Sequence, residues 1–152
     1  MAGKLQFELV SPEKLLLSQE VGMVVVPGSE GNFGVLPGHA LFISSVRPGV
    51  IDVYEDGMPT VSERIFVSGG FAEVTPERCT VLADEAMPLS ALDRAALETQ
   101  ARTLDSAIAG LTDQATRLAG DDRDIALHDL AAAERRLAVV RAKLDAIGVR
   151  QS

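Results

Sequence analysis

The stretch PGSEGNFGVLPGHA, Pro27 to Ala40, decides how the first part of the chain folds. It holds four glycines and two prolines in fourteen residues. Glycine costs backbone entropy in a helix and proline removes a hydrogen-bond donor, so this stretch cannot form a regular helix. Apolar runs at Val21–Val26 and Leu41–Val46 flank it. We therefore predict a shaped loop whose two ends are fixed in a β-sheet.

Short apolar runs surround this loop. In the first of them Leu5, Phe7 and Leu9 alternate with polar residues, which is the period of a half-buried strand. Further strands are predicted at Lys14–Leu17, Val21–Val26, Leu41–Val46, Val50–Tyr54, Thr60–Val67, Ala72–Val74 and Cys79–Ala83. Turn sequences rich in glycine, proline and acidic residues separate many of these runs. Many short strands at close spacing predict a β-sandwich or a flattened barrel.

The chain changes character near Pro88. Ten of its thirteen glycines come earlier, and long alanine-rich segments come later. Residues 1–89 carry a net charge of −7, whereas the remainder carries −1. These shifts predict a β domain over residues 1–87 followed by a helical domain over residues 88–152.

The helical part has a regular apolar repeat. Leucines recur at seven-residue intervals, at Leu97, Leu104, Leu111 and Leu118 and again at Leu130, Leu137 and Leu144. Gly120 interrupts the pattern, so we predict two helices packed as an antiparallel hairpin. Ser90 is the predicted N-cap of the first helix, and Asp121 or Asp122 that of the second. Alanine occupies many of the other apolar positions along the predicted contact between the helices, so each turn of the hairpin buries little apolar surface. We therefore hypothesise that the hairpin can dock, detach or open.

Composition limits the function classes. The chain has 152 residues, 47% apolar and 4% aromatic with no tryptophan, so its core is expected to be aliphatic. A formal charge of −8 argues against nucleic-acid binding, which needs a basic face. No run of eighteen apolar residues is present, and the first residues do not resemble a signal or transit peptide. The single cysteine, Cys79, excludes an internal disulfide. We expect a soluble intracellular protein.

The usual patterns of catalytic sites are missing. The glycine spacing over Gly28–Gly34 suggests a phosphate cradle, but no lysine with serine or threonine follows it. The two histidines, His39 and His128, fall in different predicted domains, so we expect no metal site. Cys79 lies in an apolar run typical of a core position. We therefore expect no catalysis by this chain and no required cofactor.

Several strings have a family resemblance. They are GSEGNFGVLPGHA at 28–40, RPG at 47–49, FVSGGFAEV at 66–74 and TVLADEA at 80–86. Together they resemble the ε subunit of F-type ATP synthases, the counterpart of mitochondrial δ. The resemblance implies a ten-stranded β-sandwich with a two-helix carboxyl-terminal domain, acting as a non-catalytic central-stalk subunit of the rotor.

The resemblance also implies partners and a location. The sandwich would bind the γ subunit and the polar loops of the c-ring, and so couple proton-driven rotation to ATP synthesis. The carboxyl-terminal helices would reach the α and β subunits and suppress ATP hydrolysis. The subunit would be peripheral, on the cytoplasmic side of the bacterial inner membrane, without insertion into it.

Site residues carry over from the resemblance position by position. The c-ring contact falls on Ser29, Glu30, Gly31, Asn32 and Phe33. The family often has an acidic residue where Asn32 stands, so Glu30 is left to supply the charge. The γ contact falls on His39, whose alternative role is to fix the Pro37-Gly38 turn.

A nucleotide site is expected only weakly. The ATP-binding form of the family has isoleucine or leucine, then aspartate, two variable residues and Arg-Ala. Leu92 and Asp93 begin this pattern, but Ala96 stands at the arginine position and the arginine is displaced to Arg94. Loss of that guanidinium removes a bidentate phosphate partner, so the sequence argues against ATP binding.

Two alternatives stay open. The basic residues of the second helix, Arg135, Arg136, Arg141 and Lys143, either contact acidic surfaces of the catalytic subunits or form a solvated face. The whole chain could instead be a stand-alone β-sandwich module whose loop at 27–40 binds a small ligand and whose hairpin oligomerises.

Overall fold

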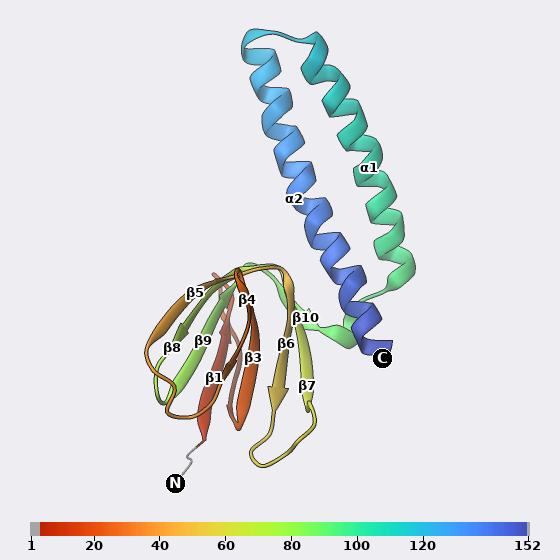
Figure 1. The fold of residues 1–152 in the computed structure, drawn as a ribbon. Helices are drawn as coiled ribbons and strands as arrows, with labels where there is room; N and C mark the ends of the chain where they lie inside the picture. The colour runs from red at the N-terminus through yellow and green to blue at the C-terminus, as the bar shows by residue number, and fades with distance from the viewer. Residues whose placement is uncertain (1–3, 152) are drawn as a thin grey trace. The chain divides into compact units, whose positions relative to one another are not determined.

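The computed structural model describes residues 4–151, which divide into two compact units between Ala91 and Leu92. The first unit contains, in the described part of the chain, ten strands and a short 3₁₀ helix (Figure 1). These are β1 (Leu5–Val10), β2 (Leu15–Val21), β3 (Met23–Gly28), β4 (Gly31–Val35), β5 (Phe42–Val46), β6 (Gly49–Tyr54), β7 (Glu63–Val67), β8 (Gly70–Val74), β9 (Arg78–Ala83), β10 (Ala86–Pro88) and η1 (Leu89–Ala91). The second unit contains α1 (Arg94–Arg117) and α2 (Gly120–Gln151).

The strands form one hydrogen-bonded sheet that folds over on itself. Their order is β10-β7-β6-β3-β5-β8-β9-β1-β2, and β4 pairs with β3 beside this path. The pairs are antiparallel except β1 with β9, which is parallel. Figure 1 shows the two layers that result, with β5, β8 and β9 in one and β6 and β7 in the other. The predicted sandwich is confirmed.

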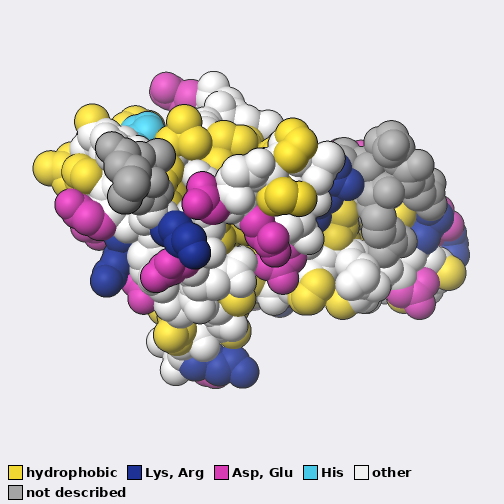
Figure 2. Space-filling model, turned by 90° about the horizontal axis from the view of Figure 1, so that it is seen from below, with side chains coloured by type: hydrophobic (Ala, Val, Ile, Leu, Met, Phe, Trp, Pro, Cys, Tyr) yellow, Lys and Arg dark blue, Asp and Glu magenta, His cyan; other side chains and the backbone are white. Residues whose placement is uncertain are grey.

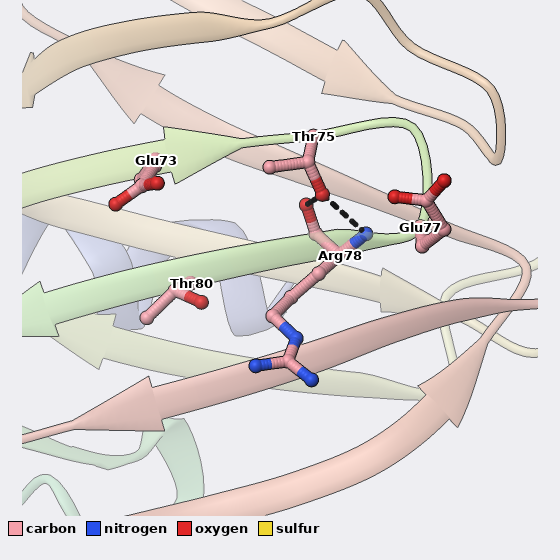
Figure 3. Close-up of a pocket in the computed structure, with 5 residues that line it drawn as sticks. All are labelled: Glu73, Thr75, Glu77, Arg78 and Thr80. Atoms are coloured by element: carbon pink, nitrogen blue, oxygen red, sulfur yellow. Dashed lines mark hydrogen bonds between the residues drawn. The ribbon is translucent and has the colours of Figure 1, made fainter.

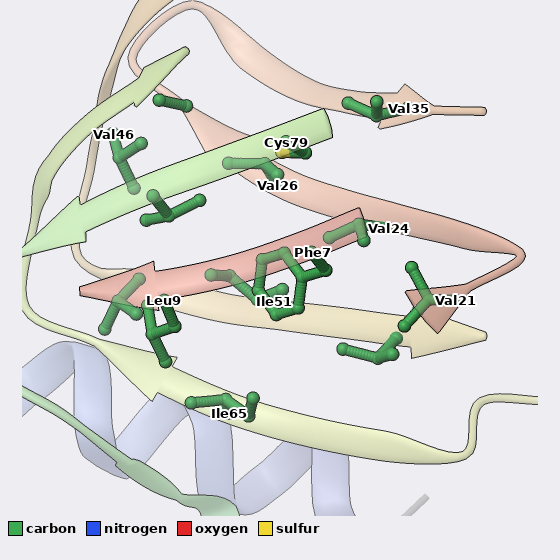
Figure 4. Close-up of a cluster of buried hydrophobic side chains, with 14 of the residues drawn as sticks. Phe7, Leu9, Val21, Val24, Val26, Val35, Val46, Ile51, Ile65 and Cys79 are labelled. Atoms are coloured by element: carbon green, nitrogen blue, oxygen red, sulfur yellow. The ribbon is translucent and has the colours of Figure 1, made fainter. Parts of the chain in front are cut away.

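An aliphatic core fills the space between the layers (Figure 4). Leu5, Phe7 and Leu9 are buried on one face of β1 and alternate with partly exposed residues, as the sequence predicted. Cys79 is fully buried in the same core, where burial raises the pKa of its thiol to about 12. This confirms Cys79 as a core residue and excludes a reactive thiolate there.

The prediction of a loop over the whole of residues 27–40 is wrong for its first half. Strand β3 continues to Gly28, and β4 returns from Gly31, which leaves a two-residue turn at Ser29 and Glu30. Glycine and asparagine have low strand propensity. Pairing with β3 overrides this low propensity. Four successive residue pairs join β3 and β4 before the last pair, Gly28 with Gly31, which flanks the turn.

Several strand boundaries also differ from the prediction; the strand predicted at Thr60–Val67, for example, begins only at Glu63. The predicted strand at Lys14–Leu17 continues through polar residues to Val21, because β2 is an edge strand paired only with β1 and its polar side chains face solvent. Gly22 then separates β2 from β3. In addition, β10 was not predicted, and it pairs with β7 and carries the first unit through η1 to Ala91.

The helices begin at other residues than predicted. Asp93, not Ser90, caps α1, and its carboxylate accepts hydrogen bonds from the backbone N–H groups of Ala95 and Ala96 at 3.0 and 3.4 Å. Ser90 lies in the turn of η1. The second helix begins at Gly120. Its φ of 61° is left-handed, a conformation that glycine adopts readily because it has no Cβ. Asp121 and Asp122 lie in its first turn, where negative charge is favourable.

The antiparallel hairpin itself is confirmed, since α1 and α2 pack side by side along their length (Figure 1). The buried side chains of α1 and α2 are Leu97, Ala115, Ala126, Ala133, Leu137, Val140, Ala146 and Ile147. Leu118 departs from the predicted stripe and is 40% exposed, because it follows the last helical residue as the C-cap. Arg123 of α2 donates from Nε to the carbonyl of Ala115 at 3.1 Å and so closes that end of the hairpin.

Candidate functional site: the hairpin tip and the apolar face of the sandwich

The β3–β4 hairpin ends in an exposed tip formed by Ser29, Glu30, Gly31 and Asn32. Gly28 and Gly31 face each other across the turn, and a Cβ on Gly28 would lie 2.7 Å from the carbonyl oxygen of Gly31. Gly31 has a φ of 139°, which side chains disfavour. The glycines of this stretch therefore allow a tight turn with four exposed residues.

Phe33 separates from the other four residues predicted for the c-ring contact. Its ring packs edge-on against Phe42 with a centroid distance of 5.1 Å, and it lies against the hydrophobic core. Phe33 is half-buried, whereas its four predecessors are exposed. The structure thus brings Ser29 to Asn32 together at the tip and places Phe33 at its base.

Arg47 contacts both strands of this hairpin. Its guanidinium donates to the carbonyl of Gly28 and to Oδ1 of Asn32, the latter at 2.6 Å. Its backbone N–H donates to the carbonyl of Pro27 at 2.9 Å. Arg47 belongs to the RPG string of the sequence, which by itself indicates no role for its side chain. No local sequence pattern signals this contact, because Arg47 and Asn32 are 15 residues apart and only the fold brings them together.

His39 lies just before β5 and is half-buried. Its Nδ1 donates to the carbonyl of Ala40 at 2.7 Å, and its ring lies 6.3 Å from that of Phe42. Its backbone N–H closes the preceding turn by donating to Leu36. Figure 2 shows hydrophobic side chains gathered around a histidine on one face of the molecule. His39 therefore fixes its turn through the backbone and leaves Nε2 for a partner.

Exposed apolar side chains run across the outer surface of one layer of the sandwich. The register pairs Phe71 with Leu82, Leu82 with Val10, and Val10 with Leu15, so these side chains form a row across four strands. We call this row, together with Ile43 of β5, the apolar face. Ile43 is 74% exposed, Phe71 59%, Leu15 55% and Leu82 44%. A contiguous exposed apolar surface of this kind marks an interaction site.

A shallow polar cavity lies on the same outer surface, beside the apolar face. It has a volume of about 390 Å³ and is lined by Glu73, Thr75, Glu77, Arg78 and Thr80 (Figure 3). The hydroxyl of Thr75 accepts from the backbone N–H of Arg78 at 3.1 Å, and the guanidinium of Arg78 pairs with Glu8 at 3.2 Å. These residues contain no nucleophile with an adjacent base, so the cavity has no evident catalytic arrangement.

The residues predicted for nucleotide binding have structural contacts of their own. Leu92 is buried, and the carboxylate of Asp93 is engaged with the first turn of α1. Arg94 is exposed. Within residues 4–151 no group of three histidine, cysteine or acidic side chains is placed to hold a metal ion. Over the same residues, no helix is both long and apolar enough to cross a membrane.

Comparison with known proteins decides the family. The family described as ATP synthase, Delta/Epsilon chain, beta-sandwich domain matches residues 4–89. The chain belongs to this family. It is 56% identical to the ATP synthase epsilon chain of Rhodospirillum centenum over 99% of this chain and 97% of that one. The epsilon chain of Rhodospirillum rubrum is 52% identical over 77% of this chain and 86% of its own length.

A solved structure supports the fold of both units. A chain of the Euglena gracilis mitochondrial ATP synthase, in an OSCP/F1/c-ring structure, aligns with a TM-score of 0.67 and 23% identity. The alignment covers 95% of this chain and 81% of that chain. As an epsilon-family protein, this chain is a non-catalytic central-stalk subunit of an F-type ATP synthase.

Proposed function

We propose that the sandwich couples c-ring rotation to the catalytic head by binding the γ subunit through the apolar face and the c-ring loops through the hairpin tip. The apolar face carries this proposal. A soluble monomer seldom leaves a row of leucine, isoleucine and phenylalanine across neighbouring strands, whereas a subunit that is covered in its complex requires one. Membership of the epsilon family makes γ the partner we assign to it.

His39 is assigned to the same contact. Leu41, two residues further on, is 76% exposed, and it leads into Ile43 of the apolar face. The γ contact would therefore extend from the apolar face to His39. A donor on the partner would bind Nε2, because Nδ1 of the neutral ring donates within the chain and leaves Nε2 as the acceptor.

The tip is assigned to the polar loops of the c-ring. Its four residues are exposed, and Glu30 supplies a carboxylate there. A polar, charged tip fits polar loops better than an apolar partner. Phe33 contributes indirectly in this proposal, since its ring anchors the base of the tip against Phe42.

The helical hairpin is assigned a restraining role, in which it contacts the α and β subunits and slows ATP hydrolysis. Arg135 and Arg136 are exposed and available for acidic surfaces of those subunits. Arg141 is already paired with Asp105 of α1 at 3.5 Å, so it contributes less to such a contact. The whole subunit would act at the cytoplasmic side of the bacterial inner membrane, as a peripheral protein.

One experiment tests the γ contact. Serine replaces both Phe71 and Leu82 in the full chain, and binding to a γ-containing catalytic core is titrated. Loss of central aromatic contacts typically costs 2 kcal/mol or more, so we expect affinity to fall by about thirtyfold or more. Met58, which is 53% exposed on the β6–β7 loop, provides the control as Met58→Ser. Unchanged affinity of the double variant would refute the assignment of the apolar face.

A second experiment separates coupling from restraint. ATP hydrolysis by the same core is followed after addition of the full chain or of residues 1–91, the first compact unit. We expect both to bind and only the full chain to slow hydrolysis. Equal rates would remove the restraining role of the hairpin. A homo-oligomer that ignores γ would overturn the rotor assignment and support the stand-alone binding module.

We also propose that ATP does not bind through Leu92, Asp93 and Arg94. The cap of α1 uses the carboxylate of Asp93, and the family's arginine position holds Ala96. Calorimetric titration of the full chain with ATP should give no saturable heat. Saturable binding that is lost in Arg94→Ala would contradict this.

A further inference from the structure

Arg47 joins three segments of the sandwich at the hairpin tip. It leaves the end of β5 and makes side-chain hydrogen bonds to Gly28 on β3 and to Asn32 on β4. These two acceptors lie on either side of the turn at Ser29 and Glu30. The guanidinium thus spans the base of the turn and connects its two strands.

Backbone contacts bring Arg47 to this position. Its N–H donates to Pro27, and the N–H of Ser29 donates to Ser45, both at 2.9 Å. In the same RPG turn, a Cβ on Gly49 would lie 3.0 Å from Cβ of Pro27, so the turn packs directly on β3. The backbone of Arg47 is therefore held against β3, which keeps its side chain within reach of the turn.

The chemistry of arginine fits this role better than that of lysine. A planar guanidinium presents several N–H donors in a fixed fork, so it reaches two acceptors at once. Both acceptors are neutral oxygens, a backbone carbonyl and a carboxamide. Among the ion pairs formed within residues 4–151, none includes Arg47. Its contacts consequently restrain the turn without neutralising Glu30.

We propose that Arg47 is a positioning residue that holds the Ser29–Glu30 turn in one conformation and so aligns Glu30 with its partner on the c-ring. This inference rests on the proposed c-ring contact of the tip. Strand pairing alone would keep the hairpin formed without Arg47. The turn would then sample several conformations, and part of the binding free energy would be spent on ordering it.

The first measurement is local. Hydrogen exchange of the Ser29 amide is followed in the full chain and in Arg47→Ala. Loss of two hydrogen bonds from a charged donor is expected to speed this exchange by about tenfold, while core amides of β1 and β9 exchange as before. Arg47→Lys keeps the charge but not the fork, and should give an intermediate rate. Arg64→Ala is the matched control, because Arg64 pairs with Asp52 elsewhere on the sandwich at 3.5 Å.

The second measurement uses the assembled enzyme in vesicles. Proton pumping per ATP hydrolysed should fall in Arg47→Ala, fall less in Arg47→Lys and stay unchanged in Arg64→Ala, with γ binding unchanged throughout. Glu30→Arg tests the contact itself. If Glu30→Arg pumps normally, the proposed c-ring contact fails. If Glu30→Arg is impaired but Arg47→Ala pumps normally or leaves Ser29 exchange unchanged, the positioning role of Arg47 is overturned. If Arg47→Ala does not fold, the exchange and pumping of Arg47→Lys decide in the same way.

Discussion

The sandwich and the helical hairpin are stabilised in different ways. The core of the sandwich joins residues far apart in the chain, so that Phe7 and Cys79 are register partners on parallel strands. The hairpin joins two neighbouring helices through one stripe that includes Ala115, Ala126 and Ala133. A core built from many strands resists local change, whereas one shared stripe of small side chains can open at moderate cost. The sandwich is therefore the more rigid unit and the hairpin the more adaptable one, which fits the coupling and restraining roles proposed above.

The largest expected effect is the difference in alkylation rate of Cys79 between the native and the denatured chain. Burial raises the pKa of its thiol to about 12 from a reference value of 9.0, so at pH 8 the folded thiolate is about a thousandfold rarer. Alkylation of the native chain should accordingly be at least about a thousandfold slower than in denaturant. Rapid alkylation of native protein would show that the sandwich opens easily.

The same burial predicts how stability depends on pH. The folded thiol keeps its proton at pH values where the unfolded thiol loses it, so the folded state binds more protons above pH 9. Stability of the sandwich should therefore fall as pH rises from 9 towards 12. Cys79→Ala should lose this part of the alkaline dependence, as measured by denaturant unfolding at several pH values.

Phe7→Ala should destabilise the sandwich by about 4 kcal/mol, because it empties a fully buried aromatic site. Exposure of Cys79 to alkylating reagent during denaturant titration reports on this unit. The helical signal in circular dichroism reports on the hairpin and should change much less. Equal shifts in both signals would mean that the two units unfold together.

Leu137→Ala should destabilise the hairpin by about 2 kcal/mol, the lower end for a buried leucine, since a single stripe between two helices relaxes around the cavity. Here the helical signal should shift while exposure of Cys79 does not. Leu127, which is 39% exposed on α2, supplies the control as Leu127→Ala. A loss equal to that of Phe7→Ala would contradict the idea of an adaptable hairpin.

Asp93→Ala should cost about 1 kcal/mol of hairpin stability through loss of the N-cap of α1. Ser90→Ala changes the residue that the sequence predicts as the cap. It should leave the midpoint temperature of helix unfolding unchanged. The reverse order of effects would restore Ser90 as the cap. Circular dichroism during thermal unfolding of both variants makes this comparison.

Arg141→Ala should have the smallest effect, at most about 0.5 kcal/mol. The guanidinium of Arg141 and the carboxylate of Asp105 are 3.5 Å apart, and both side chains are mostly exposed. Water and salt therefore screen their attraction. A larger loss in the helical transition would show that charges, and not the apolar stripe, hold the hairpin closed.

The fold was predictable where local pattern and burial agree. The alternation of Leu5, Phe7 and Leu9 and the seven-residue repeat of the helices each predicted the observed element. Strand β4 was missed because Gly31, Asn32 and Gly34 have low strand propensity, and only pairing with β3 makes them extended. Ser90 and Asp93 are both good cap residues, and only the η1 turn decides between them.

The c-ring contact stays a prediction, but the structure shows how its residues lie. The resemblance assigned Ser29 to Phe33 to one contact, whereas Ser29 to Asn32 are exposed at the tip and Phe33 packs at its base. Arg47 reaches Asn32 from 15 residues away, and a sequence pattern does not reveal such a contact. Ile43 and Phe71 look like core residues until register shows that they lie on the outer surface.

The parallel pairing of β1 with β9 also affects how the chain folds during synthesis. Cys79, the register partner of Phe7, is synthesised 72 residues after it. At about 5–20 residues per second, β1 would wait roughly 4–14 seconds for that partner. Throughout this time its apolar side chains have no completed layer to cover them. During this interval β1 can pair only with β2, and its pairing with β9 completes the sandwich only after β9 has left the ribosome.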